Sequence, residues 1–320
     1  MKNLWPTLRL SLLGLPPEET GYERRGFRGA TGGVRNRLEQ IGAAFMAGYH
    51  AALQHGTPLA LAAPLNAVEA ELRGFAFEGA AMGLALLDLL TPWAPTRVSR
   101  FLSGAGAAHA YMVHVGVGWV WARFPFGFRR RRRRLEPLLS WLAFDGWGFH
   151  EGFFHWPEYL AGQGAPRRLH GYERRAFDQG LGRSLWFVNG GNPDLIASSV
   201  GNLAEDRRRD LWSGIGLAAT YAGIVNREAL ETLHRLAGKE QPALAQGSAF
   251  AAKARQRAGN LTEYTDLAAS VLAGVSAPEA CRLCDATVEN LPASGGEPAY
   301  EVWRQRLQTR LQIHRPLQLV

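Results

Sequence analysis

Apolar positions recur with the spacing of α-helices along most of the chain, and the alternation expected of β-strands is scarce. Residues that favour helix starts precede several of these segments. Asn192 and Asn226 are examples, and Ser276 begins a Ser-Ala-Pro-Glu sequence typical of a capping box. Residues 302–311 mix apolar and basic positions at helical spacing, and a short alternating stretch, 124–128, is interrupted by proline and glycine. The pattern predicts an all-α protein.

Three apolar segments are unusually rich in very small residues: 79–83, 104–108 and 214–218. Glycine costs about 1 kcal/mol relative to alanine inside a helix, so its repeated use needs a reason. One interpretation is close packing of helix backbones. The other is a long, narrow apolar cavity lined by the tryptophans of the central region.

A seven-residue segment occurs twice, as Gly21–Phe27 and as Gly171–Phe177, with six of the seven positions identical. Residues 77–83 can also be aligned, more weakly, with 212–218. Self-similarity at a long period predicts two pseudo-repeated helical halves that pack on each other. The corresponding division is an N-terminal segment 1–20, a first half 21–165, and a second half 166–320 that includes a C-terminal helix.

Composition describes a globular protein of 320 residues with a net charge of +8. No run reaches the roughly 18 apolar residues of a membrane span, and residues 1–15 lack the features of a signal peptide. These observations predict a cytoplasmic protein. The two cysteines, Cys281 and Cys284, fall one turn apart on a predicted helix, and we expect them to be packed core residues.

Six consecutive arginines, Arg129–Arg134, carry much of the positive charge. They form either a solvated loop or a contact for an anionic partner, such as a membrane surface or an acidic carrier protein. Phe124, Phe126 and Phe128 precede the run and suit peripheral contact with a membrane surface, where the protein would then be located. Nucleic acid is not an expected partner, because no recognition motif accompanies the charge.

Six histidines form three pairs of identical spacing: His50 and His55, His109 and His114, and His150 and His155. Residues five apart lie about 140° apart around a helix, so one pair cannot chelate a metal ion. A metal site would need one ligand from each of several helices. We therefore assign no metal-ligating residue, and the sequence leaves metal dependence open and the cofactor unknown.

Residues 145–155 form the most chemically suggestive segment. Glu151 and His155 lie one turn apart on the same helix face and could form a general acid/base pair, with His150 beside them. The alternative is a helix whose polar residues are satisfied among aromatic neighbours.

Three further residues are candidates. Glu78 lies in an apolar, small-residue helix, where a carboxylate must be paired or hydrogen-bonded. Asp178 and Arg183 offer an acid and a base near one turn, with a simple ion pair between them as the alternative. Asp210 is more typical of a helix cap or a surface residue. Motifs for phosphate binding and for acyl-serine nucleophiles are absent from the sequence.

Five segments resemble hallmark sequences of one bacterial family: 74–90, 145–155, 177–188, 210–223 and 247–260. It is the domain-of-unknown-function family whose members are known as enediyne biosynthesis proteins, and the resemblance covers roughly residues 21–284. It implies action on a polyketide-derived apolar intermediate, because related genes resemble neighbours of enediyne polyketide synthases. It supplies no catalytic residue.

The resemblance and the residues together lead to two expectations. The first is an enzyme that matures a polyene or enediyne-type polyketide intermediate by oxidation, dehydrogenation or cyclisation. The alternative is a non-catalytic protein that shelters this hydrophobic small molecule and presents it to partner biosynthetic enzymes. The residues expected to carry catalysis are Glu78, His150, Glu151, His155, Asp178 and Arg183.

Overall fold

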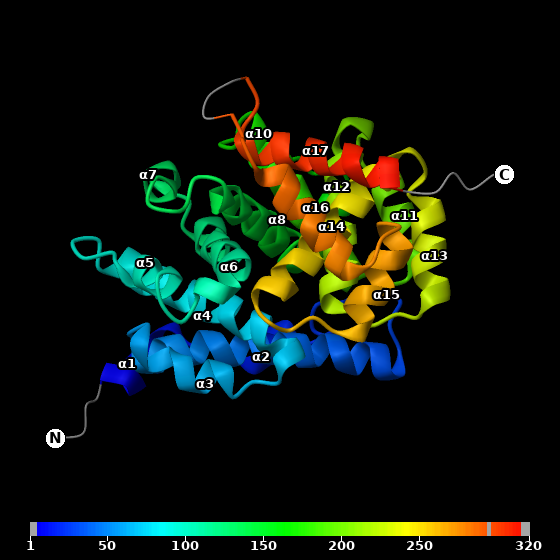
Figure 1. Cartoon of the computed structure of the whole chain (residues 1–320). Coiled ribbons are helices and arrows are strands. Elements are labelled where there is room, and N and C mark those ends of the chain that lie inside the picture. Colours follow the sequence, from blue (N-terminus) through cyan, green and yellow to red (C-terminus); the bar gives the residue numbers. More distant parts are fainter. Residues whose placement is uncertain (1–4, 293–295, 315–320) are drawn as a thin grey trace. The chain divides into compact units, whose positions relative to one another are not determined.

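A computed structural model describes residues 5–292 and 296–314, and within these residues every regular element is a helix (Figure 1). The all-α prediction is confirmed. The helices belong to two compact units, which divide within helix α8.

The first unit contains the described residues up to Gly26 together with Arg35–Trp147. Its α-helices are α1 (Trp5–Leu13), α2 (Gly32–His55, apart from its first three residues), α3 (Ala62–Asn66), α4 (Ala70–Leu90), α5 (Arg97–Leu102), α6 (Ala110–Arg123), α7 (Phe128–Arg132) and the first part of α8 (Leu142–Phe154). Short 3₁₀ helices connect them: η1 (Pro17–Thr20), η2 (Leu59–Leu61), η3 (Ala107–His109) and η4 (Leu139–Trp141).

The second unit contains Phe27–Val34 and the described residues from Gly148 onwards. After the second part of α8 come α9 (Trp156–Leu160), α10 (Tyr172–Val188), α11 (Pro193–Gly201), α12 (Glu205–Ala222), α13 (Arg227–Leu236), η5 (Gly238–Glu240), α14 (Gln241–Arg257), α15 (Glu263–Leu272), α16 (Ala277–Val288) and α17 (Ala299–His314).

Several helix starts follow the sequence prediction. The side chains of Asn192, Asn226 and Ser276 each accept a hydrogen bond from a backbone N–H of the first turn of α11, α13 and α16. Cys281 and Cys284 are free, buried thiols on α16, as expected, and burial raises the pKa of Cys281 to about 11. Residues 124–127 form the turn that leads into α7.

The long helices of the second unit cross at glycines. A Cβ atom added to Gly182 on α10 would lie 2.0 Å from the carbonyl oxygen of Leu211, and one on Gly214 of α12 would lie 1.8 Å from that of Gln179. Each glycine therefore faces the backbone carbonyl of the residue that lies three positions before the other glycine of the pair. Gly216 on α12 and Gly247 on α14 repeat the arrangement. At each crossing the backbones are in direct contact, which suits Cα–H···O interactions.

The first unit uses the same crossing. Gly48 on α2 and Gly79 on α4 form one reciprocal pair, and Gly118 on α6 and Gly146 on α8 form another. Gly116 on α6 faces α4, where Ala81 replaces the second glycine. Close packing of helix backbones thus explains the small residues at 79–83 and 214–218.

Paired glycines let one helix contact two neighbours. Residues two apart on a helix lie about 160° apart around its axis, so Gly116 and Gly118 of α6 face α4 and α8 respectively. Gly214 and Gly216 of α12 do the same for α10 and α14. On each long helix from α2 to α12, one small residue faces the next long helix along the chain. These residues are Gly48, Ala81, Gly118, Gly148, Gly182 and Gly216, and the successive intervals between them are 33, 37, 30, 34 and 34 residues.

The two-half repeat stays a prediction, because its clearest segment takes two different structures. Residues 22–26 form a turn, whereas Tyr172–Phe177 begin α10. The similarity between 77–83 and 212–218 matches two equivalent crossings on α4 and α12. Residues 104–108 are a different case, since they form a turn and the start of η3 instead of a long helix.

A buried ion cluster attaches α17 to α10 and α12. Arg304 is fully buried, and its Nη1 donates to Asp210 at 2.7 Å, to Glu301 at 3.0 Å and to the hydroxyl of Tyr172 at 3.1 Å. Burial alone would raise the pKa of Asp210, but Arg304 and Arg175 outweigh it and lower that pKa. The prediction of a cap or surface role for Asp210 was wrong, because Asp210 lies inside α12 and is 2% exposed.

Among the described residues, no single helix is long and apolar enough to cross a membrane, although α15 and α16 together meet the length and composition criteria with a bend of 67°.

Candidate functional site

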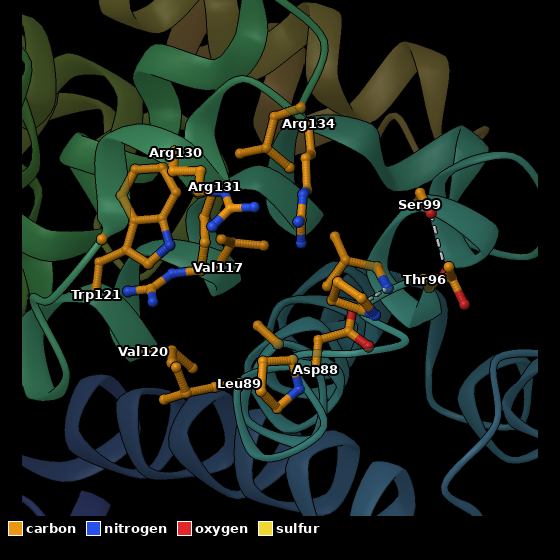
Figure 2. Close-up of a pocket in the computed structure, with 16 residues that line it drawn as sticks. Asp88, Leu89, Thr96, Ser99, Val117, Val120, Trp121, Arg130, Arg131 and Arg134 are labelled. Atoms are coloured by element: carbon orange, nitrogen blue, oxygen red, sulfur yellow. Dashed lines mark hydrogen bonds between the residues drawn. The ribbon is translucent and has the colours of Figure 1, made fainter.

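A pocket of about 570 Å³ lies among α4, α5, α6 and α7 of the first unit (Figure 2). This volume is within the roughly 300–1,000 Å³ typical of small-molecule sites. Its lining residues are Ala85, Asp88, Leu89, Pro92, Pro95, Thr96, Val98, Ser99, Val117, Val120, Trp121, Gly127, Arg130, Arg131, Arg134 and Leu135.

The base of this pocket is apolar and buried. Val117, Val120 and Trp121 of α6 form much of it, and Ala85 of α4 and Val98 of α5 complete it. Helix α6 is apolar around most of its circumference. Its glycines place α4 against one face and α8 against another, so both of these faces are buried. The remaining face can therefore offer apolar side chains to a ligand.

Three arginines of the six-residue run line the other side of the pocket (Figure 2). Arg130 and Arg134 are exposed, and Arg131 is half-buried and donates a hydrogen bond from Nη2 to the carbonyl oxygen of Phe124 at 2.8 Å. Burial, and then the like charge of Arg134, lowers the pKa of Arg131. In the part of the chain that the structure describes, no carboxylate pairs with Arg130 or Arg134.

The single carboxylate in the pocket lining is already engaged. Asp88 accepts hydrogen bonds from the backbone N–H groups of Arg97 and Val98, both at 3.0 Å, and from the Arg97 side chain at 3.2 Å. It therefore caps the start of α5 and does not neutralise the three arginines. The pocket combines an apolar base with an uncompensated positive mouth.

The remaining arginines of the run have other surroundings. Arg132 lies 3.6 Å above the Trp141 ring and donates to Ser140 Oγ at 3.0 Å, and Arg129 lies over the Phe128 ring at 4.6 Å. The run thus serves three purposes: fixing the chain to η4, lining a pocket, and carrying charge into solvent. Sequence reasoning treated it as one surface feature and did not foresee the pocket.

The second candidate site is in the second unit, at the end of α8. His155 Nδ1 lies 3.1 Å from Glu151 Oε2, and His150 Nδ1 lies 3.5 Å from Glu151 Oε1. The hydroxyl of Tyr159 also reaches Glu151 Oε2, at 3.5 Å. Glu151, His150 and His155 are therefore brought together as predicted: Glu151 and His150 are in the last turns of α8, and His155 directly follows α8 with its backbone N–H bonded to the Glu151 carbonyl.

The two histidines favour the ionised form of Glu151. Burial alone would raise the pKa of Glu151, but hydrogen bonding and charge from His150, with those of His155, outweigh burial and lower it. Burial, and then the charge of Glu151, raises the pKa of Tyr159. A carboxylate base beside an exposed imidazole can accept and pass on a proton.

The other predicted site residues lie elsewhere. Asp178 receives a bidentate interaction from Arg207, with its shortest contact at 2.6 Å, instead of pairing with Arg183. Burial raises the pKa of Asp178 to about 6 although Arg207 opposes the shift. Arg183 is buried with its guanidinium 4.8 Å above the Phe149 ring. Both residues support the packing of α10.

Glu78 is in the first unit and is 2% exposed on α4. Its Oε1 accepts a hydrogen bond from the indole N–H of Trp119 at 3.0 Å, and the Trp119 ring packs on Phe45 at 4.4 Å. The prediction that this carboxylate must be hydrogen-bonded is confirmed. Glu78 is not among the residues that line the pocket.

The other histidine pairs make structural contacts. His50 Nε2 lies 2.9 Å from the carbonyl oxygen of Leu15, and His114 Nδ1 lies 2.7 Å from that of Ala110. His109 stacks on Phe77 with 3.9 Å between ring centroids. Within the described residues, no three or more His, Cys, Asp and Glu side chains are grouped so that they could hold a metal ion.

One family model, described as "Protein of unknown function (DUF1702)", matches residues 4–311, and the chain therefore belongs to that family. No curated protein and no solved structure matches the chain.

Proposed function

We propose that this member of the DUF1702 family binds an elongated apolar molecule with an anionic end in the pocket of the first unit. The supporting observation is the combination of a buried apolar base with three arginines at the mouth, two of which pair with no carboxylate in the described chain. Apolar burial supplies affinity, and a guanidinium group suits a carboxylate or phosphate.

The ligand class follows from the same features. A polyene-like polyketide acid, the intermediate expected from the resemblance to enediyne biosynthesis proteins, has a long apolar body and one anionic end. We propose that the protein shelters such a molecule in the cytoplasm and presents it to partner biosynthetic enzymes.

Fluorescence titration with cis-parinaric acid, a conjugated tetraene carboxylic acid that brightens in apolar surroundings, tests the proposal. Arg134→Gln removes a charge at the mouth and should weaken binding by roughly tenfold or more, since a hydrogen bond to a charged group contributes about 1.5–3 kcal/mol. Arg133→Gln is the matched control, because Arg133 is exposed and does not line the pocket. Equal affinities in both variants would contradict the proposal.

A second pair of variants tests the apolar base. Leu89→Trp adds bulk inside the pocket, whereas Leu90→Trp adds the same bulk at an exposed neighbouring position outside it. We expect only Leu89→Trp to reduce parinaric acid binding. The alcohol with the same hydrocarbon chain should bind the wild-type protein more weakly than the acid does.

Catalysis is a second proposal, supported by the close grouping of Glu151, His150 and His155. This grouping could act as a general acid/base site in the maturation of the polyene intermediate. Proton transfer to and from a polyene moves its double bonds without changing its mass, so chromatography of parinaric acid incubated with the protein, which separates isomers, tests it: Glu151→Gln and His155→Ala should abolish any isomer formed while leaving probe binding intact. If the wild-type protein forms no product, the binding function stands alone.

A further inference from the structure

Two exposed aromatic side chains flank the mouth of the pocket. Trp93 is 81% exposed in the α4–α5 loop, between the lining residues Pro92 and Pro95. Phe126 is also 81% exposed and directly precedes the lining residue Gly127. A tryptophan and a phenylalanine pointing into solvent on two loops beside one opening are unusual for a surface that contacts only water.

Positive charge lies on one side of the same opening. Arg129, Arg130, Arg133 and Arg134 are exposed and follow Phe126 within eight residues. Asp88, the only carboxylate among the lining residues, is neutralised by Arg97. Exposed aromatic rings together with arginines are the combination found where proteins meet the headgroup region of a membrane.

We propose that this surface, formed by Trp93, Phe126 and the arginines 129, 130, 133 and 134, docks on an anionic membrane with the pocket mouth against the lipid. Charge complementarity favours a membrane, because about 1 kcal/mol is gained for each basic residue near an anionic surface. The two rings enter the headgroup layer and add apolar burial. The apolar pocket base then lies next to the phase in which a long apolar ligand dissolves.

Sedimentation with vesicles of phosphatidylcholine alone, or containing about one third phosphatidylglycerol, tests this inference. The protein should sediment with the anionic vesicles and be released by salt, since the contact is partly electrostatic. Arg129→Gln with Arg133→Gln should weaken partitioning about 30-fold, from about 1 kcal/mol for each charge. Trp93→Ser with Phe126→Ser should leave a weaker contact that is more sensitive to salt.

Matched controls separate this surface from exposed residues in general. Leu59→Ser changes an apolar side chain that is 91% exposed but far from the lining residues in sequence, and Arg235→Gln with Arg310→Gln removes two exposed charges of the second unit. Both controls should sediment like the wild type. Equal loss in the controls, or no binding to anionic vesicles, would overturn the proposal, as would binding only to an acidic protein.

The vesicle experiment is independent of the proposed ligand. None of the four substituted residues, Trp93, Phe126, Arg129 and Arg133, lines the pocket. These variants should therefore bind parinaric acid in solution as tightly as the wild type. Loss of vesicle binding with retained probe binding supports membrane docking, whereas failure of probe binding in the wild type refutes only the proposed function.

Discussion

Replacing Gly214 with alanine at the α10–α12 crossing sets two opposing effects against each other. In an isolated helix this change stabilises by about 1 kcal/mol. At the crossing, the new methyl carbon would lie 1.8 Å from the carbonyl oxygen of Gln179 and 2.8 Å from the backbone nitrogen of Arg183. Both neighbours are backbone atoms of a helix, so neither can rotate away.

The conflict is resolved only if the two helices separate by more than about 1 Å. A gap of that size forfeits up to about half of the dispersion attraction across an interface. Overpacking of this kind costs about 1–3 kcal/mol, and more where backbone must move. We expect Gly214→Ala to lower the free energy of unfolding by about 2 kcal/mol or more, after the gain in helix propensity is included.

Gly201 provides the control. It is the last residue of α11, and an added Cβ would meet no atom within 4 Å. Gly201→Ala should therefore stabilise the protein by a few tenths of a kcal/mol up to about 1 kcal/mol. Urea denaturation followed by far-UV circular dichroism measures both variants. The close-crossing argument is refuted if Gly214→Ala is as stable as Gly201→Ala.

The reciprocal geometry makes a further claim about the double variant. Gly182 faces α12 at the same crossing, so helices already separated by one methyl group have room for the second. The cost of Gly182→Ala with Gly214→Ala should therefore be smaller than the sum of the single costs by about 1 kcal/mol or more. Additive costs would mean that the two glycines act at independent places.

Two other predictions concern charge. Burial, and then the charge of Arg73, lowers the pKa of His109 to about 4. Between about pH 6.5 and 4 the unfolded chain therefore binds more protons than the folded protein does. Up to about 3 kcal/mol of folding stability is lost as the pH falls through this window. His109→Phe keeps a ring against Phe77 and removes the titrating group. In this variant the urea midpoint of unfolding should change less with pH between about pH 6.5 and 4 than in the wild type. Arg304→Met removes the buried cation shared by Asp210 and Glu301 and leaves them only the half-buried Arg175, so it should destabilise by up to about 3–5 kcal/mol at neutral pH. The deficit, measured by the same denaturation, should shrink towards pH 4 as the two carboxylates become protonated.

Local features of the fold could be predicted from the sequence. Helix caps at Asn192 and Ser276 depend on residues three positions away, and the contact between Glu151 and His155 depends on one helical turn. Such spacings fix distances before any tertiary structure is known.

Features that depend on distant segments could not be predicted in this way. The partner of Asp178 is Arg207, 29 residues later on another helix, and nothing local favours it over Arg183. The same holds for the pocket, which needs α4, α5, α6 and α7 to meet around one space. Six identical residues in a row also give no indication that Arg132 stacks on Trp141 while Arg134 lines the pocket.

The glycine crossings have a consequence for how the chain can fold during its synthesis. In the second unit each long helix meets the next after about 34 residues, which a ribosome adds in roughly 2–7 seconds. A helix forms in about a microsecond, so each crossing can close before the next helix has emerged.

The ion cluster of Asp210 and Arg304 can form only later in synthesis. Asp210 must wait for Arg304, 94 residues later, or about 5–19 seconds at the same rate. Until then Asp210 has Arg175 of α10 as its cation but lacks Arg304, and α12 exposes the face that α17 will cover. Truncation before α17 should therefore leave the crossed helices assembled but open to proteases along that face.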